Sequence, residues 1–365
     1  MDIAASLPTA ARKPLSDWNI EELGRLMTKD SNPIRRRMAF ARLLQGLTPE
    51  NAQLIREQVK SLRPESSEFK DFHYAWGAIS GAEAVLNGKK TREVDMAVTM
   101  AGWASAQPDL AFDWFNELPE GEGYDRNGLK GAMIGGIADN DPAAAAHYAY
   151  QLAEMGDKEA QGMLGIVASR VLRAEGPLEA SVWAENLPDG PMRAAAMDRV
   201  AHDYVAVDPQ GAAAWAERFA GEAHNARVIE EVGDEWAERD PVAAINWLNS
   251  LSASEGKSAG LSSAFGEWAR RDPQAASEHL ISMPESPERD SAISGFSGRL
   301  ASENPQAAIA WAAEINDSNA RENALVRAGQ SMFRRDANGA RTWLATSGLP
   351  PAAQQQVVNP PQRRR

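Results

Sequence analysis

The chain has 365 residues, of which 43% are hydrophobic and 24% charged, and its formal net charge is −13 at pH 7. An acidic balance of this size disfavours proteins that coat nucleic acid or anionic membranes, because both roles require a basic face. The sequence contains no cysteine, which excludes disulfides, thiolate catalysis and zinc–thiolate sites.

The N-terminal part is predicted to be helical but irregular. Residues 1–15 are expected to form a flexible leader, and they lack the apolar segment of a signal peptide. Residues 16–90 are interpreted as an N-terminal cap, because the terminal repeats of repeat proteins commonly differ from the rest. Within this cap, cap residues and apolar spacing predict helices at 16–27, 33–46 and 66–86, and a short one after Thr48-Pro49.

A repeat follows from residue 91 onward. An anchor proline, usually preceded by Asp or Asn, recurs at intervals of 34, 35 and then repeatedly 32 residues. Alanine stands three residues after each anchor and tryptophan six residues after most of them. The anchors are Pro108, Pro142, Pro177, Pro209, Pro241, Pro273, Pro305 and, in place of proline, Ala337.

Each repeat is predicted to be a pair of helices. Asp or Asn is a preferred N-cap, proline is preferred at the first helical position, and proline disfavours helix in the residue before it. The Asp-Pro pair should therefore end one helix and begin the next. Apolar residues three, six, seven and ten positions after the anchor lie on one helical face, and a second such stripe precedes it. Alanine there permits close packing, and tryptophan is interpreted as core rather than as a ligand platform.

The strings DPVAAINWLNSL at 240–251 and NPQAAIAWAAEI at 304–315 resemble α-solenoid repeats of the tetratricopeptide-like or HEAT-like kind. The resemblance covers residues 91–348, although the period of 32 is shorter than the tetratricopeptide period of about 34. It implies an all-α solenoid, a right-handed superhelix or arc of about eight hairpins, that binds protein segments on its curved surface. Residues 349–365, rich in Pro, Gln and Arg, are expected to be a disordered tail.

No sequence motif predicts catalysis, a cofactor or a metal ion. None of the five histidines forms an HxxxH or HxH pair, and His279, which occupies a tryptophan position, is interpreted as a packing residue. Ser254 and Lys257 match the SxxK pattern of serine acyl-enzymes but lack its SDN and KTG companions. The candidate binding residues are instead polar positions beside the apolar stripe of a longer helix: Arg227, Glu230, Glu231 and Glu235.

These features predict a non-catalytic scaffold that binds a protein segment or complex, with the acidic balance favouring a basic partner. One alternative is a structural subunit of a larger assembly, which would expose an unusually large apolar patch. Another is an enzyme on an α/α toroid, such as a lyase or glycosidase, which needs two carboxylates converging in a cavity. No membrane span is predicted, because no run of about 18 apolar residues occurs. The compartment stays open between the cytoplasm and a mature exported, periplasmic form.

Overall fold

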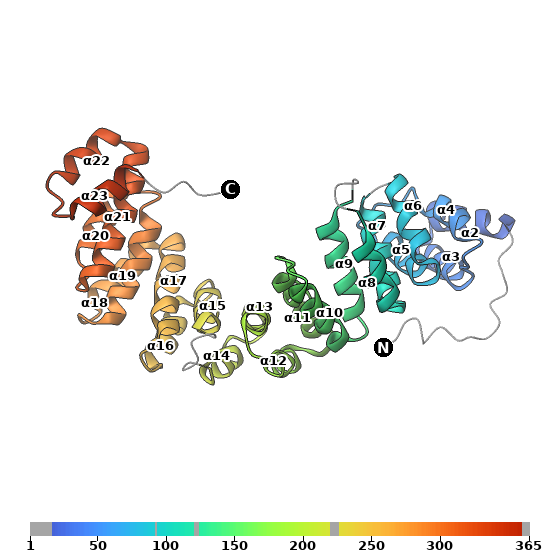
Figure 1. Ribbon diagram of the computed structural model, residues 1–365, viewed down its shortest axis with the longest axis horizontal. Coiled ribbons are helices and arrows are strands. Elements are labelled where there is room, and N and C mark those ends of the chain that lie inside the picture. Colours follow the sequence, from blue (N-terminus) through green and yellow to red (C-terminus); the bar gives the residue numbers. More distant parts are fainter. Residues whose placement is uncertain (1–16, 92, 120–123, 220–225, 360–365) are drawn as a thin grey trace. The chain divides into compact units, whose positions relative to one another are not determined.

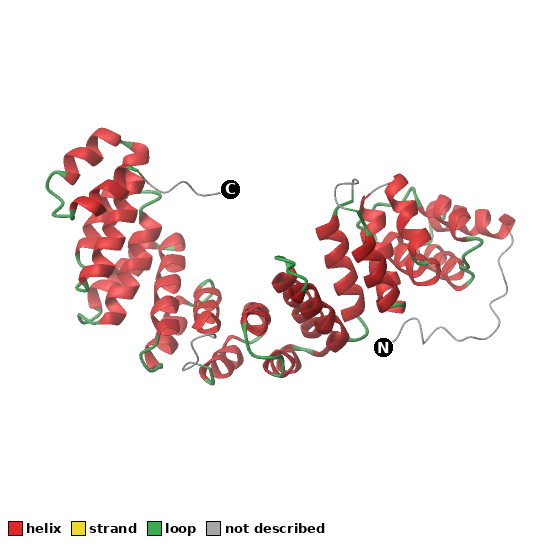
Figure 2. Cartoon of the chain, in the orientation of Figure 1, coloured by secondary structure: helices red, strands yellow, loops and turns green. Residues whose placement is uncertain are grey.

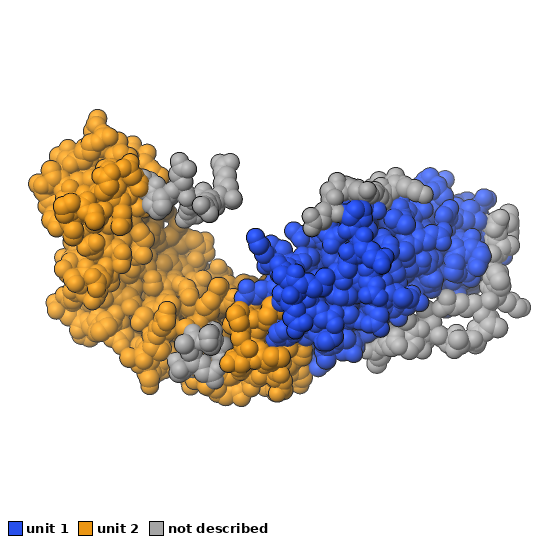
Figure 3. All heavy atoms as spheres, viewed as in Figure 1, with its two compact units in different colours: residues 1–176 blue, residues 177–365 orange. Residues whose placement is uncertain are grey.

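The computed structural model describes residues 17–91, 93–119, 124–219 and 226–359. Across these residues it contains 22 α-helices and no strand (Figures 1 and 2), which confirms the all-α prediction. The expected leader at 1–15 lies outside the described residues. None of the helices described is long and apolar enough to cross a membrane. The chain forms two compact units, Met1–Gly176 and Pro177–Arg365 (Figure 3), so the division falls inside the range that the repeat marks out.

In the first unit, long helices pack side by side in chain order, α5 on α7, α7 on α9 and α9 on α11. The shorter helices α8 and α10 each contact the long helix before and the long helix after them. The helices of this unit are α2 (Asp17–Lys29), α3 (Pro33–Gln45), α4 (Ala52–Val59), α5 (Ser67–Ser80), α6 (Ala82–Thr91), α7 (Glu93–Ala106), α8 (Pro108–Glu117), α9 (Arg126–Ala138), α10 (Pro142–Glu154) and α11 (Ala160–Glu175).

The second unit repeats this arrangement. Its long helices α13, α15, α17, α19 and α21 contact one another in sequence, and α14, α16, α18 and α20 each pack between two of them. The helices are α12 (Pro177–Glu185), α13 (Pro191–Val207), α14 (Pro209–Glu217), α15 (Ala226–Ala237), α16 (Pro241–Ser250), α17 (Glu255–Arg271), α18 (Pro273–Ser282), α19 (Pro287–Leu300), α20 (Pro305–Ala313), α21 (Ser318–Arg335), α22 (Ala337–Leu344) and α23 (Pro351–Val358).

The anchor residues act as predicted, since a shorter helix begins at every one of the eight. Asp240 shows the mechanism: its side chain accepts a hydrogen bond of 3.0 Å from the backbone N–H of Ala243. Asp272 does the same for Ala275 at 3.0 Å and is also the C-cap of the preceding helix. One residue therefore satisfies a free N–H of the new helix and ends the old one.

The apolar faces of the shorter helices form the core. The alanine three residues after the anchor has 0% exposed surface in all eight repeats. Nine tryptophans stand either six residues after an anchor or five residues before one, and all nine are buried or half-buried. This confirms their packing role. The indole N–H of Trp247 donates to Glu217 at 3.0 Å, and that of Trp215 donates to Glu185 at 2.8 Å. Each of these bonds joins a shorter helix to the shorter helix of the repeat before it.

Glycines allow the long helices to approach backbone to backbone. A Cβ atom built on Gly77 of α5 would lie 1.9 Å from the carbonyl oxygen of Thr99 in α7. On Gly295 of α19 it would lie 1.7 Å from the carbonyl oxygen of Ser262 in α17. No real Cβ tolerates such distances, so these positions fix how closely the long helices pack.

Two expectations are corrected. The helix expected over 66–86 is two helices, α5 and α6, because the chain breaks at Gly81, whose φ of +56° suits glycine. The tail expected to be disordered over 349–365 contains α23, which packs on α21 through buried Ala353 and Val357. These two residues lie four apart on one helical face, and burying them outweighs the polar composition of the segment. Residues 360–365 lie outside the described residues.

Candidate functional site

The four candidate residues share one side of α15. Its apolar stripe, which includes Ile229 and Val232, is buried against neighbouring helices. Positions three and four residues apart lie on one helical face, so the polar residues form a separate stripe. These residues are Arg227, Glu230, Glu231, Asp234 and Glu235, of which Arg227 is exposed and the others are half-buried.

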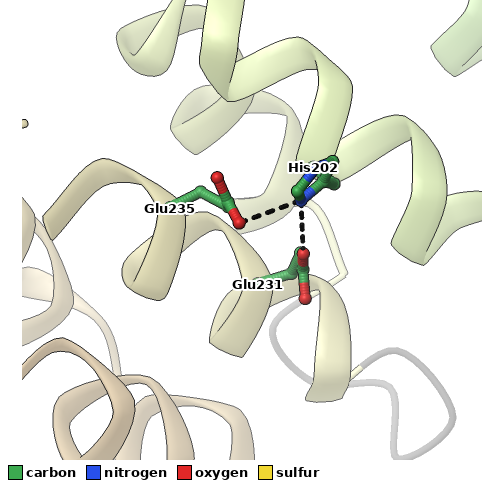
Figure 4. A group of neighbouring side chains, drawn as sticks. All are labelled: His202, Glu231 and Glu235. Atoms are coloured by element: carbon green, nitrogen blue, oxygen red, sulfur yellow. Dashed lines mark hydrogen bonds and ion pairs between the residues drawn. The ribbon is translucent and has the colours of Figure 1, made fainter. Parts of the chain in front are cut away.

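A histidine from the preceding long helix completes the most compact part of the site (Figure 4). His202 of α13 points between Glu231 and Glu235, which stand one turn apart on α15. Its Nδ1 atom lies 2.9 Å from a carboxylate oxygen of Glu231 and 2.9 Å from one of Glu235. The His202 side chain is 41% exposed and the two carboxylates 25% and 26%, so solvent reaches the cluster. These three groups are of the types that bind transition-metal ions, and their ligand atoms lie within 4.8 Å of one another.

Acidic neighbours surround this cluster. Burial, reinforced by the charges of Glu231 and Glu267, raises the pKa of Asp234 to about 6. Burial also raises the pKa of Asp198 above its ordinary value, although the Arg227 guanidinium opposes the shift. The pKa of Glu231 is raised chiefly by burial and then by Asp198, against the lowering effect of the His202 hydrogen bond. The site therefore concentrates negative charge in a partly desolvated environment, which is unfavourable without a cationic neighbour.

The remaining two candidate residues make contacts with neighbouring long helices. Arg227 has a side chain that is 74% exposed and pairs with Asp198 of α13 at 3.2 Å. Glu230 accepts a hydrogen bond of 3.1 Å from the hydroxyl of Ser263 in α17. The four residues thus lie together on one helix, as their spacing predicts, while their contacts extend to α13 and α17. Sequence reasoning missed Asp198, His202 and Asp234.

Comparison with protein-family models, with curated proteins and with solved structures finds no match to this chain. The function of the site is therefore inferred from its own side chains.

Two residues that matched a catalytic pattern have structural roles. The Ser254 hydroxyl caps α17 by accepting a hydrogen bond of 3.1 Å from the backbone N–H of Lys257. The nearly buried Lys257 ammonium donates to the carbonyl oxygen of Leu251 at 3.0 Å and pairs with Glu288 at 3.0 Å. Both groups are therefore engaged in ending one helix and beginning the next. His279 packs against Trp268 with ring centres 5.4 Å apart, as expected for a residue in a tryptophan position.

Proposed function

We propose that the chain is a non-catalytic protein-interaction scaffold of the α-solenoid type, in which stacked helical hairpins present their long helices to a partner. The stacking of long helix on long helix within each unit supports this architecture. So does a link that recurs between successive repeats. In three repeats, the side chain two residues before the anchor donates a hydrogen bond to a backbone carbonyl at or just after the end of the long helix of the repeat before. These hydrogen bonds are Asn140 to Ser105 at 3.2 Å, Arg239 to Ala206 at 2.7 Å and Arg335 to Glu303 at 2.6 Å.

The partner we propose is a basic segment of another protein, bound on the acidic face. We define the acidic face as six carboxylates of α13, α15 and α17: Asp198, Glu230, Glu231, Asp234, Glu235 and Glu267. The observation that carries this proposal is the crowding of these six half-buried carboxylates on three neighbouring helices. Burial, and then the charges of the nearby glutamates, raise the pKa of Asp234 to about 6. Lys and Arg side chains would relieve this repulsion, and opposite charge on the two surfaces also speeds association and fixes orientation.

The test uses a displayed library of random peptides, selected on the immobilised full-length chain in the presence of EDTA. We expect Lys- and Arg-rich sequences to be enriched, and their affinity to fall as salt rises. The double variant Glu230→Gln/Asp234→Asn should weaken the selected peptides by at least about tenfold, because two charges facing the partner are lost. Neither residue belongs to the His202 cluster.

The control is a second double variant with the same change in charge, Glu154→Gln/Glu314→Gln, at two exposed positions away from the acidic face. It should bind the selected peptides as the wild type does. If the selection enriches no basic residues, or if both double variants lose affinity equally, the proposed partner class is wrong.

A further inference from the structure

We propose that His202, Glu231 and Glu235 bind a first-row divalent transition-metal cation of the zinc class. This inference goes beyond the scaffold function and does not depend on it. It rests on one nitrogen and two carboxylate oxygens that converge from two helices. Glu231 and Glu235 lie on adjacent turns of α15, so the helix itself holds both carboxylates toward α13.

The ligand atoms lie slightly closer together than they would around a bound zinc ion. In tetrahedral zinc sites the metal–ligand bonds are about 2.0–2.2 Å, which places neighbouring ligand atoms about 3.3 Å apart. The Nδ1 atom of His202 lies 2.9 Å from each carboxylate oxygen. Small side-chain rotations would open this separation enough for an ion to sit between the three atoms. The two helices need not move, since all three side chains are partly exposed.

Hydrogen bonding alone serves this cluster poorly. The Nδ1 atom of an imidazole carries at most one hydrogen, yet two carboxylate oxygens lie equally close to it. The Nδ1 atom can therefore donate a full hydrogen bond to only one of the two carboxylates, and the oxygen of the other lies close to it without a hydrogen to accept. A cation bound by the nitrogen lone pair and by both oxygens would satisfy all three atoms at once.

Asp198 adds a further carboxylate near the cluster. It lies one helical turn before His202 on α13, and its charge acts on both His202 and Glu231. Its Oδ1 atom is shielded from solvent and has no hydrogen-bond partner among the described residues, while Oδ2 pairs with Arg227. A buried carboxylate oxygen without a donor is costly. The negative charge of Asp198 also favours a cation bound at the neighbouring cluster.

The ligand set indicates which cations fit. Mg²⁺ and Ca²⁺ prefer oxygen ligands throughout, whereas an imidazole nitrogen with carboxylates suits Zn²⁺, Co²⁺ and similar ions. Three protein ligands leave at least one coordination position of such an ion open. Because the cluster is partly exposed, water or a side chain of a bound partner can occupy that position.

The experiment titrates Co²⁺ and then Zn²⁺ into the full-length chain, prepared without an affinity tag and freed of metal with EDTA. Co²⁺ should give visible absorption bands of a low-symmetry site that saturate at one equivalent, and Zn²⁺ should displace it with a low-micromolar Kd by calorimetry. His202→Asn, Glu231→Gln and Glu235→Gln should each weaken binding at least about tenfold. Circular dichroism checks that each variant keeps its helices.

The matched control is Glu230→Gln, which removes a charge directly beside Glu231 without removing a proposed ligand, and it should bind Zn²⁺ as the wild type does. The proposal is overturned if no saturable binding appears, or if His202→Asn binds as tightly as the wild type. It is also overturned if the His202 ring signals in NMR respond to pH and not to Zn²⁺. That result would identify the cluster as a hydrogen-bonded ion pair only.

Discussion

Two glycines one turn apart on α19 predict opposite effects of the same substitution. A Cβ at Gly295 would lie 1.7 Å from the Ser262 carbonyl oxygen, whereas nothing lies within 4 Å of a Cβ at Gly298. Alanine is favoured over glycine in helices by up to about 1 kcal/mol, so Gly298→Ala should stabilise the chain by several tenths of a kcal/mol or more. Gly295→Ala makes the same gain in helix propensity, but the added methyl group overlaps the backbone of α17.

The size of the second effect follows from what must move. Overpacking a core costs about 1–3 kcal/mol when side chains can adjust. Here the obstacle is a helix backbone, so α17 and α19 must separate and lose part of their buried contact. We expect Gly295→Ala to reduce the free energy of unfolding by at least about 2 kcal/mol.

Urea unfolding followed by circular dichroism measures both variants. Because repeat proteins can unfold in parts, hydrogen exchange of α17 and α19 should show where protection is lost. If Gly295→Ala proved as stable as Gly298→Ala, the close approach of the two helices would be wrong.

Three further predictions concern charge and packing. Asp234→Asn should stabilise the chain at pH 7.5 and have almost no effect at pH 3. The pKa of Asp234 is raised from its ordinary value of 3.8 to about 6. The contribution of this carboxyl to stability is therefore fully present below pH 3.8 and is lost as the pH rises through 6. The pKa shift limits the gain in unfolding free energy at pH 7.5 to about 3 kcal/mol, and the partial exposure of Asp234 reduces the expected gain to about 1–2 kcal/mol. Urea unfolding in EDTA at both pH values measures this, and an equal effect at both would contradict it. Trp247→Phe removes the donor to Glu217 and should show a coupling of about 0.5–1 kcal/mol with Glu217→Ala in a double-mutant cycle. Additive losses would show that the bond contributes nothing. Lys257→Met leaves the Leu251 carbonyl and Glu288 without their cation and should cost about 2–3 kcal/mol by chemical unfolding. If Lys257→Met lowered the free energy of unfolding by less than a few tenths of a kcal/mol, the structural role of the Lys257 ammonium would be wrong.

The regular part of the fold was predictable because its determinants are local. An Asp-Pro pair ends and begins helices through its own φ preference and its own side chain. That is why the start of every shorter helix could be placed from the sequence. The two wrong predictions, a single helix over 66–86 and a disordered tail over 349–365, followed the overall composition of a segment and overlooked individual residues within it. Gly81 marked a break inside an expected helix, and the apolar pair Ala353 and Val357 marked a helix within a polar tail.

The candidate site was predicted only in part, because its residues lie on two helices, α13 and α15. Spacing along α15 brings Glu230, Glu231 and Glu235 onto one stripe, whereas His202 belongs to another helix. Motif searches look for ligands a few residues apart, so they miss a site that combines His202 with glutamates about 30 residues later in the sequence. The repeat offered the missing information: His202 stands seven residues before its anchor, and Glu235 stands six before the next anchor. Equivalent faces of successive long helices meet when the repeats stack in register.

The same alignment shows why the acidic face belongs to a few helices rather than to the repeat. In α15, the positions eleven, ten and seven before the anchor are Glu230, Glu231 and Asp234. In α17 they are two serines and a glycine, and in α19 a serine and two glycines, including Gly295. The small residues serve packing, since Gly295 touches the backbone of α17. The carboxylates instead bond to side chains of the neighbouring long helices, Glu230 to Ser263 and Glu231 to His202. Burial raises the pKa of Asp234 at a cost in stability. This cost in stability supports our proposal of a cationic ligand, because a bound cation or cationic segment would offset the crowded negative charge.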